Sequence, residues 1–348
     1  QASEALKRPL MLLKALGEDN LVESLKRFGG SRDRLLKGIG DDTSVSVQKG
    51  GLALLATTDI LIEGVHFKKK NTPAYLLGRK ALSVSLSDIA AMGGTPLFFL
   101  VSLALSPSTP KKFIDELYRG LDEVAREAGC DLAGGNVAKT PGPMMVSTTV
   151  IGEAAAKDVV YRKGARTGDL IFITGTIGGS ALGLKTLMAG KKTPLSRLPW
   201  KESVKKHLDP APRLKAGQAI AKARLATAMM DISDGVALDL KRLCLESKKS
   251  AVVYLNSLPI SDELRTCGKK TGNSPLLEFA LTGGEDYELL FTSPEENLRK
   301  ISTLSRKLGL PITPVGRVVS PKKAGRPVVV LDENGEPMDL KKPGFEHF

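Results

Sequence analysis

Acidic residues recur in this chain where apolar runs end and where glycine turns begin. Asp41 and Asp42 follow the turn GIG, and Asp59 closes the apolar run GLALLATTD. Singly, an Asp at a helix start is more often a cap than a ligand, and an Asp in a glycine turn is more often turn chemistry. Their recurrence instead favours a shared role for one set of carboxylates: Asp41, Asp42, Asp59, Asp88, Asp231, Asp234, Glu285 and Asp286.

The chemistry that these carboxylates favour is the binding of a hard divalent cation. All of them supply oxygen ligands, the hydroxyls of Thr57, Thr58 and Ser233 adjoin them, and the chain has only three histidines. Such donors select Mg2+ or Mn2+ over zinc or copper, and protein-bound Mg2+ usually accompanies phosphate. The sequence therefore predicts a magnesium site that handles phosphate groups.

Asp88 is expected at the centre of this metal site. It continues a helical stripe that is otherwise formed by Leu77, Ala81 and Val84. A carboxylate on a buried helix face is costly unless it is paired or bound to a cation.

Three predicted glycine turns could let backbone amides approach phosphate oxygens: GGN at 134–136, GTIGG at 175–179 and TGG at 282–284. The chain has no GxxxxGK[ST] loop and lacks the HRD and DFG signatures of protein kinases. Any phosphoryl transfer must therefore use another scaffold.

The elements that would position these residues alternate between strands and helices. Periodicity predicts helices at 18–28, 74–92 and 111–129, and strands at 51–61, 97–106 and 144–154. Later in the chain, Ser180 is expected to cap a helix that ends before Gly190. We therefore predict two mixed α/β (α+β) domains, at 1–155 and 156–348.

Composition limits which binding partners and which cellular location are expected. The formal charge is +13, but the lysine pairs are scattered and aromatics are only 5% of residues, so the pattern favours a solvated surface over a nucleic-acid site. No run approaches the roughly 20 apolar residues of a membrane span. We find no secretory leader, and three widely spaced cysteines fit reduced thiols, so a cytoplasmic protein is expected.

Taken in order, several motifs resemble the thiamine-monophosphate kinase family, which is related to aminoimidazole ribonucleotide synthetase. The matching segments span nearly the whole chain: GIGDDTSV, TTDILIEGVHF, KALSVSLSDIAAMGGTP, LAGGN, RKGARTGDLIFITG, DISDG, LTGGEDYELLFT and the terminal GFEHF. GIGDD, LSDIAAMG, DISDG and GGEDYEL together are highly specific, whereas no single one would be.

The resemblance implies ATP-dependent phosphorylation of thiamine monophosphate to thiamine diphosphate, the last step of thiamine diphosphate biosynthesis. It also implies a homodimer in which the N-terminal domains pair their sheets, with helices covering the C-terminal sheet. The implied Mg2+ ligands are Asp42, Thr57, Thr58, Asp59, Asp88, Asn136, Asp231 and Asp234. The implied ATP contacts are Gly135, Asn136, Arg162 and Ser233, and the implied thiamine contacts are His66, Glu285 and Phe345.

Two positions qualify what the resemblance implies. The family often has Asp where this chain has Asn136, which offers an oxygen but no charge, so metal binding at that corner is in question. Taken without the resemblance, His66 is interpreted as a structural residue at a strand end.

The implied reaction joins two anions, so their repulsion is the main obstacle, and several Mg2+ ions would neutralise and align them. A phosphate monoester has a second pKa of about 6 and is largely a dianion at pH 7. It needs no general base, so we expect direct in-line transfer with Asp88, Asp42 and Asp231 as the central carboxylates. Of the aspartate pair, Asp42 is expected to bind metal and Asp41 to accept backbone N–H groups.

The alternatives lie inside and outside this superfamily. Aminoimidazole ribonucleotide synthetase-like activity remains open. Selenophosphate synthetase would need a reactive N-terminal Cys, whereas the first Cys is Cys130, and the hydrogenase-maturation protein would end in Cys. Outside the superfamily, the alternative is a non-catalytic nucleotide or nucleic-acid binder that uses the +13 charge.

Overall fold

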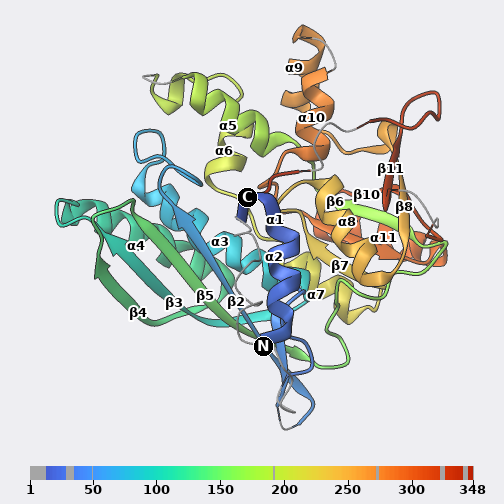
Figure 1. Ribbon diagram of the computed structural model, residues 1–348, viewed down its shortest axis with the longest axis horizontal. Helices are drawn as coiled ribbons and strands as arrows, with labels where there is room; N and C mark the ends of the chain where they lie inside the picture. Colours follow the sequence, from blue (N-terminus) through green and yellow to red (C-terminus); the bar gives the residue numbers. More distant parts are fainter. Residues whose placement is uncertain are drawn as a thin grey trace, which may run out of the picture.

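The computed structural model describes residues 13–28, 35–48, 50–190, 193–271, 274–321, 326–339 and 344–347. Figure 1 shows two halves, each built on its own sheet, with helix α3 (Ala74–Ala91) at their junction. The last strand of the first sheet ends at Ala155, and the first strand of the second begins at Leu170.

The first half is a five-stranded sheet with two helices on one face. Its strand order is β1-β2-β5-β3-β4, and β3 and β4 are its parallel pair. The strands are β1 (Ser44–Val47), β2 (Leu52–Ile62), β3 (Thr95–Leu105), β4 (Asp131–Lys139) and β5 (Met145–Ala155). Helices α3 and α4 (Lys111–Ala128) cover its inner face, where side chains such as Leu55, Phe99 and Val150 are buried.

Two glycines let α3 and α4 approach closely. A Cβ on Gly78 would lie 1.9 Å from the carbonyl oxygen of Leu117, and one on Gly120 would lie 2.0 Å from that of Tyr75. No larger residue fits at this crossing. The contact fixes α3, which carries Asp88, over the sheet.

The outer face of the first sheet carries apolar side chains that nothing in the described chain covers. All nine residues of β4 are exposed. The exposed large apolar residues on this face are Leu52 and Ile60 of β2 and Phe98 and Leu100 of β3.

The second half is a six-stranded sheet of order β11-β8-β10-β6-β9-β7. The strands are β6 (Leu170–Thr174), β7 (Ala228–Asp231), β8 (Ser250–Tyr254), β9 (Leu289–Ser293), β10 (Ile312–Val319) and β11 (Val328–Leu331). The remaining helices are α1 (Leu13–Leu16), α2 (Glu18–Leu25), α5 (Gly179–Ala189), α6 (Lys201–Leu208), α7 (Leu214–Lys222), α8 (Val236–Ser247), α9 (Asp262–Thr271), α10 (Ser274–Thr282) and α11 (Leu298–Leu308). Short 3-10 turns are η1 (Lys26–Phe28), η2 (Leu195–Arg197), η3 (Leu255–Ser257) and η4 (Glu295–Asn297).

Helices cover both faces of the second sheet. Ile171 and Ile173 pack with Leu240 of α8 on one face, while Phe172 packs with Ile220 of α7 and with residues of α11 on the other. The prediction of two mixed α/β halves, the second with a helix-covered sheet, is confirmed.

Most of the predicted elements are present, and two local predictions are wrong. The helix expected at 18–28 is α2 followed by η1, and the helix expected at 111–129 is α4, ended by Gly129 in the left-handed conformation. The GGN segment is not a turn but part of β4, because Gly135 lies against β3, where a Cβ would be 1.8 Å from the oxygen of Val101. Ser180 does not cap α5: its backbone N–H is held by Asp286, and its hydroxyl meets His207.

Candidate active site

Three predicted carboxylates from distant parts of the chain converge at the junction of the two halves. Asp42 precedes β1, Asp88 lies near the end of α3, and Asp231 ends β7. One ligand oxygen from each lies within 4.8 Å of the others. Ser87 of α3 donates a hydrogen bond of 2.6 Å to Asp231 Oδ2 and so joins the halves at this point.

Arg162 partly balances the charge of this three-carboxylate cluster. Its guanidinium lies 2.6 Å from Asp42 Oδ1. The backbone N–H of Arg162 donates to Asp41 Oδ1 at 3.0 Å, and that of Asp42 donates to the same oxygen at 3.3 Å. Asp41 therefore accepts backbone N–H groups, as expected, while Asp42 turns toward the cluster.

Burial and mutual repulsion raise the affinity of the cluster for protons. Burial, then the charges of Asp59, Asp231 and Asp42, raise the pKa of Asp88 well above its usual range. Burial, then the charge of Asp42, raise the pKa of Asp231 in the same way. A group of like charges in this state favours a counter-cation.

The cluster fits a hard divalent cation by its donor set and by one free ligand atom. Asp42 Oδ2 is buried and accepts no hydrogen bond from any described residue. All three groups offer carboxylate oxygens, the ligands that Mg2+ prefers. Thr57 adjoins them, because its hydroxyl donates to Asp88 Oδ2.

Strand β2 sends its predicted ligands to opposite faces of the sheet. Thr57 and Asp59 are on the inner side, where Ser85 of α3 donates to Asp59 Oδ2 at 2.7 Å. Thr58 is exposed on the outer side and lies 3.0 Å from the hydroxyl of Thr149. Because strand residues alternate between faces, Thr58 does not share a side with the three-carboxylate cluster.

Asn136 lies away from the cluster in this chain. Across the sheet, Asn136 pairs with Ser102, Ser102 with Ser147, and Ser147 with Ile60. Asn136 therefore lies on the same face as the exposed Ile60, the outer face. Strand β4 is three strands from β2, or about 14 Å at the usual strand spacing. Gly135 precedes Asn136 on the same edge strand.

The DISDG loop is clamped by an aspartate and an arginine that sequence reasoning missed. Asp239 Oδ2 accepts the backbone N–H groups of Ser233, Asp234 and Gly235 at 3.0–3.1 Å. Arg242 pairs with both Asp234 and Asp239. Asp234 thus lies outside the three-carboxylate cluster and is held by a cation of the chain itself. The spacing of Asp234, Asp239 and Arg242 around the start of α8 was the sequence signal that could have indicated these contacts.

The C-terminal segment crosses over the junction and joins two of the predicted substrate residues. The backbone N–H of Phe345 donates a hydrogen bond of 3.1 Å to the backbone carbonyl oxygen of Asp234. The centroid of the Phe345 ring lies 5.0 Å from that of the His347 ring. The ring centroids of His347 and His66 are 5.2 Å apart, and the backbone N–H of His347 donates a hydrogen bond to the carboxylate of Glu18. Figure 1 shows this end of the chain beside α1 and α2.

Glu285, the third predicted substrate residue, belongs to a charge-balanced group with two residues that sequence reasoning missed. Its Oε1 lies 2.7 Å from the ammonium of Lys80 and its Oε2 lies 3.1 Å from Nδ1 of His207. Burial pushes the pKa of Glu285 upward, but Lys80 and His207 outweigh it and hold this pKa below its usual range. Lys80 could have been found, because it lies three residues after Leu77 on the buried stripe of α3.

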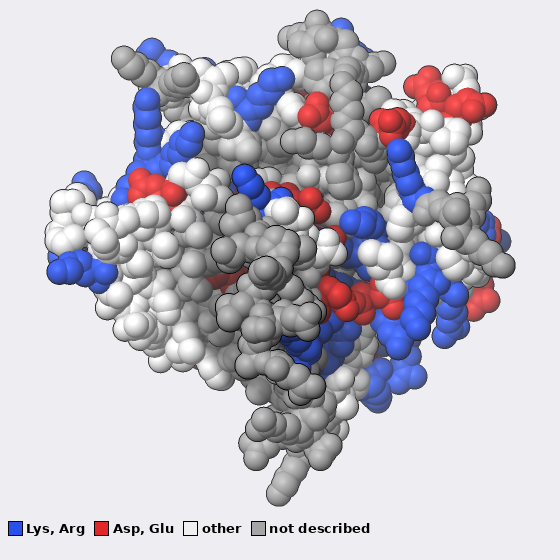
Figure 2. All heavy atoms as spheres, viewed as in Figure 1, with Lys and Arg blue, Asp and Glu red and all other residues white. Residues whose placement is uncertain are grey.

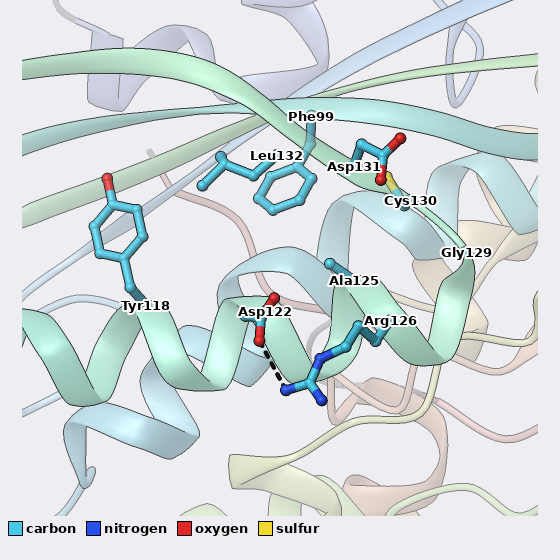
Figure 3. Close-up of a pocket in the computed structure, with 9 residues that line it drawn as sticks. All are labelled: Phe99, Tyr118, Asp122, Ala125, Arg126, Gly129, Cys130, Asp131 and Leu132. Atoms are coloured by element: carbon cyan, nitrogen blue, oxygen red, sulfur yellow. Dashed lines mark hydrogen bonds and ion pairs between the residues drawn. The ribbon is translucent and has the colours of Figure 1, made fainter.

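Hollows on the described surface also occur away from this junction. A hollow of about 290 Å3 lies between α4 and strands β3 and β4, where Figure 3 shows Phe99, Tyr118 and an Asp122–Arg126 ion pair around it. It contains none of the predicted site residues. On the face in Figure 2, Lys and Arg side chains lie over both halves among acidic ones. Among the described residues, no helix is long and apolar enough to cross a membrane.

Family models match most of the chain. The model described as AIR synthase related protein, N-terminal domain, matches residues 40–154, and the corresponding C-terminal model matches 166–328. Thiamine-monophosphate kinase of Bacillus subtilis (strain 168) is 35% identical over 89% of this chain and 93% of the relative. The enzyme of that name from Escherichia coli (strain K12) is 34% identical over 96% and 99%.

Solved structures agree with the sequence relatives. AaThiL complexed with AMPPCP and TMP matches with a TM-score of 0.84 and 35% identity, covering 98% of this chain and 100% of that chain. Hydrogenase maturation protein HypE in complex with ATP, at 20% identity and a TM-score of 0.66, shares the fold alone. The chain belongs to the AIR synthase related family and, within it, to the thiamine-monophosphate kinases.

Proposed function

We propose that this protein transfers the γ-phosphoryl group of ATP to thiamine monophosphate, giving thiamine diphosphate. The observation that carries the proposal is the convergence of Asp42, Asp88 and Asp231, with one buried oxygen left free, at the junction of the two halves. Relatives that bear this enzyme name match over nearly their full length, and one was solved with AMPPCP and TMP.

Asp42, Asp88 and Asp231 would hold magnesium, with Thr57 and Asp59 beside them. When bound, Mg2+ would offset the repulsion between the two phosphate groups and align them. The chain itself keeps the carboxylates in place through Ser87 and Arg162, so little reorganisation is needed. Because the acceptor is already a dianion, we propose direct in-line transfer without a phosphoryl-enzyme.

For ATP, we propose contacts from Gly135, Asn136, Arg162 and Ser233. The partly buried Arg162 pairs with Asp42 of the cluster, and Ser233 lies in the clamped loop after Asp231, and these positions support the proposed phosphate contacts. Asn136 is on the outer edge strand, so its contact fits a homodimer in which two outer faces pair. The exposed apolar side chains of β2 and β3 on that outer face support this assembly.

For the thiamine moiety, we propose contacts from His66, Glu285 and Phe345. His347 connects two of them, and the ion pair with Lys80 holds the third. We also propose that the chain divides near residue 155 and that the protein works in the cytoplasm, where its three cysteines would stay reduced.

The test is to incubate the protein with Mg-ATP and thiamine monophosphate and to separate the products chromatographically. Thiamine diphosphate and ADP should appear in equal amounts, and chelation of Mg2+ should stop both. ADP release without thiamine diphosphate, in the presence of active control enzyme, would contradict the proposal. Radiolabel from γ-labelled ATP retained on denatured protein would contradict direct transfer.

A further inference from the structure

Lys80 carries a buried positive charge beside the predicted substrate residues. Its side chain is 1% exposed, and its ammonium lies 2.7 Å from Glu285 Oε1 without hydrogen-bond geometry to any described residue. A buried ion pair is a weak source of stability, since an apolar pair of similar volume is often as stable or more so. The arrangement therefore favours a role in the site over a role in folding.

Both oxygens of Glu285 are held by side chains. Oε1 meets Lys80, and Oε2 lies 3.1 Å from Nδ1 of His207, which also lies 3.1 Å from the hydroxyl of Ser180. An ionised carboxylate only accepts hydrogen bonds, so Nδ1 of His207 carries the proton. Burial, then the charge of Lys80, lower the pKa of His207, so its ring is neutral at pH 7.

The backbone of Glu285 is fixed as well. Its φ is 65°, in the left-handed region that non-glycine residues rarely adopt, and its N–H donates to the oxygen of Ser233 at 2.7 Å. A Cβ on the preceding Gly284 would lie 2.5 Å from that same oxygen. The loop that carries Glu285 therefore cannot shift without disturbing the DISDG loop.

We propose that Lys80 and His207 are positioning residues, which hold the Glu285 carboxylate in one orientation so that it accepts a hydrogen bond from an amino group of the substrate. The inference rests on the proposed function. About a quarter of the Glu285 side chain remains exposed to receive a ligand. Lys80 already neutralises the Glu285 carboxylate. The carboxylate would therefore recognise the substrate by accepting a hydrogen bond in a fixed direction rather than by attracting a cation.

Thiamine monophosphate carries one such group, the exocyclic amine of its pyrimidine ring. A site built to accept from an N–H rejects an analogue that lacks it, because its buried acceptor is then left unpaired. The oxo analogue, oxythiamine monophosphate, places an oxygen where the amine would be. Discrimination between the two substrates therefore reports the orientation of Glu285.

The experiment compares kcat/KM for thiamine monophosphate and for oxythiamine monophosphate in the wild type, Lys80→Met and the control Arg79→Met. Arg79 is next in the chain and pairs α3 with Asp209 at the end of α6, but it does not touch Glu285. We expect Lys80→Met to raise KM for thiamine monophosphate at least tenfold and to reduce discrimination at least tenfold, with KM for ATP within twofold. Arg79→Met should lower Tm while leaving discrimination within twofold of the wild type.

The outcomes separate the two claims. A wild type that makes no thiamine diphosphate overturns the proposed function. An active wild type whose discrimination survives Lys80→Met overturns the inference alone. If Lys80→Met fails to fold, His207→Leu replaces it, because it releases the other carboxylate oxygen and should reduce discrimination about threefold. Unchanged discrimination in that variant would equally overturn the inference.

Discussion

Two groups of acidic side chains at the junction differ in how their charge is balanced. Among the described residues, the cation paired with the cluster of Asp42, Asp88 and Asp231 is the guanidinium of Arg162, so the cluster keeps an excess of negative charge. Glu285 has its own buried cation in Lys80. The pKa of Asp88 is raised by burial and by its acidic neighbours, whereas the pKa of Glu285 is held low by Lys80 and His207 against its burial.

The difference indicates which group depends on something from outside the chain. An excess of buried negative charge is costly unless a cation or a proton joins it. A paired carboxylate needs neither and can be ready before substrate binds. The three-carboxylate cluster should therefore respond to metal, and Glu285 should respond only to substrate.

The largest expected effect is the loss of turnover in Asp88→Asn. Removing the central ligand should lower kcat at least about 100-fold, the scale on which single electrostatic groups act in catalysis. The circular dichroism spectrum and Tm should change little. Asp122→Asn, on the exposed face of α4, serves as the control. Near-normal turnover in Asp88→Asn would remove Asp88 from the metal site.

The aspartate pair should divide its roles under separate substitution. Asp42→Asn should lower kcat about 100-fold and raise the Mg2+ concentration needed for half-maximal rate, because its free Oδ2 is the proposed ligand. Asp41→Asn should lower activity less than tenfold, since the amide oxygen can still accept the backbone N–H of Arg162. Equal losses in the two variants would contradict this division.

Arg162→Ala should raise KM for ATP about tenfold, corresponding to roughly 1.4 kcal/mol of lost binding. The arginine pairs with Asp42 of the cluster and is a proposed contact of the ATP phosphates. Steady-state kinetics at saturating Mg2+ would measure the effect, with KM for thiamine monophosphate as the internal comparison. An unchanged KM for ATP would limit Arg162 to balancing the charge of Asp42.

Magnesium should stabilise the wild type and not Asp88→Asn. A ligand that binds only the folded state at 100 times its Kd adds about 2.7 kcal/mol of stability. For a chain of this size we expect Tm to rise by several degrees in thermal unfolding with Mg2+. Lys80→Met should keep the full rise, since Glu285 takes no part in metal binding. Loss of the rise in Tm in Lys80→Met would show that Glu285 and the three-carboxylate cluster do not act separately in metal binding.

The smallest expected effect concerns Asp286, next to Glu285. Burial raises the pKa of Asp286 to about 7 from 3.8, against the opposing backbone N–H groups of Gly178 and Ser180. A folded pKa above the unfolded value means that the contribution to stability is complete below pH 3.8 and is lost as the pH rises through about 7. Between pH 5 and pH 8, the fall in Tm should therefore be about 2 °C smaller in Asp286→Asn than in the wild type. Parallel Tm curves would refute this.

The sequence predicted the local parts of the fold because local patterns fix them. Helical periodicity defined α4, and an apolar run defined β2. The turn predicted from the glycines at 134–136 is a strand in the structure. Gly135 is needed there because the backbone approaches β3 closely, not because the chain reverses. A glycine alone does not say which of these two uses it has.

By itself, the sequence determined which residues could do chemistry: oxygen-bearing side chains at the ends of apolar runs, in an order that matches one family. Only the tertiary structure decided which of them meet. Asp42, Asp88 and Asp231 converge because β1, α3 and β7 come together, and strand alternation leaves Thr58 and Asn136 on the other face. The pairing of Glu285 with Lys80 and His207 escaped prediction because contacts between distant segments depend on strand register and helix packing. The Asp239 clamp, by contrast, is local, and residue spacing at the start of α8 could have indicated it.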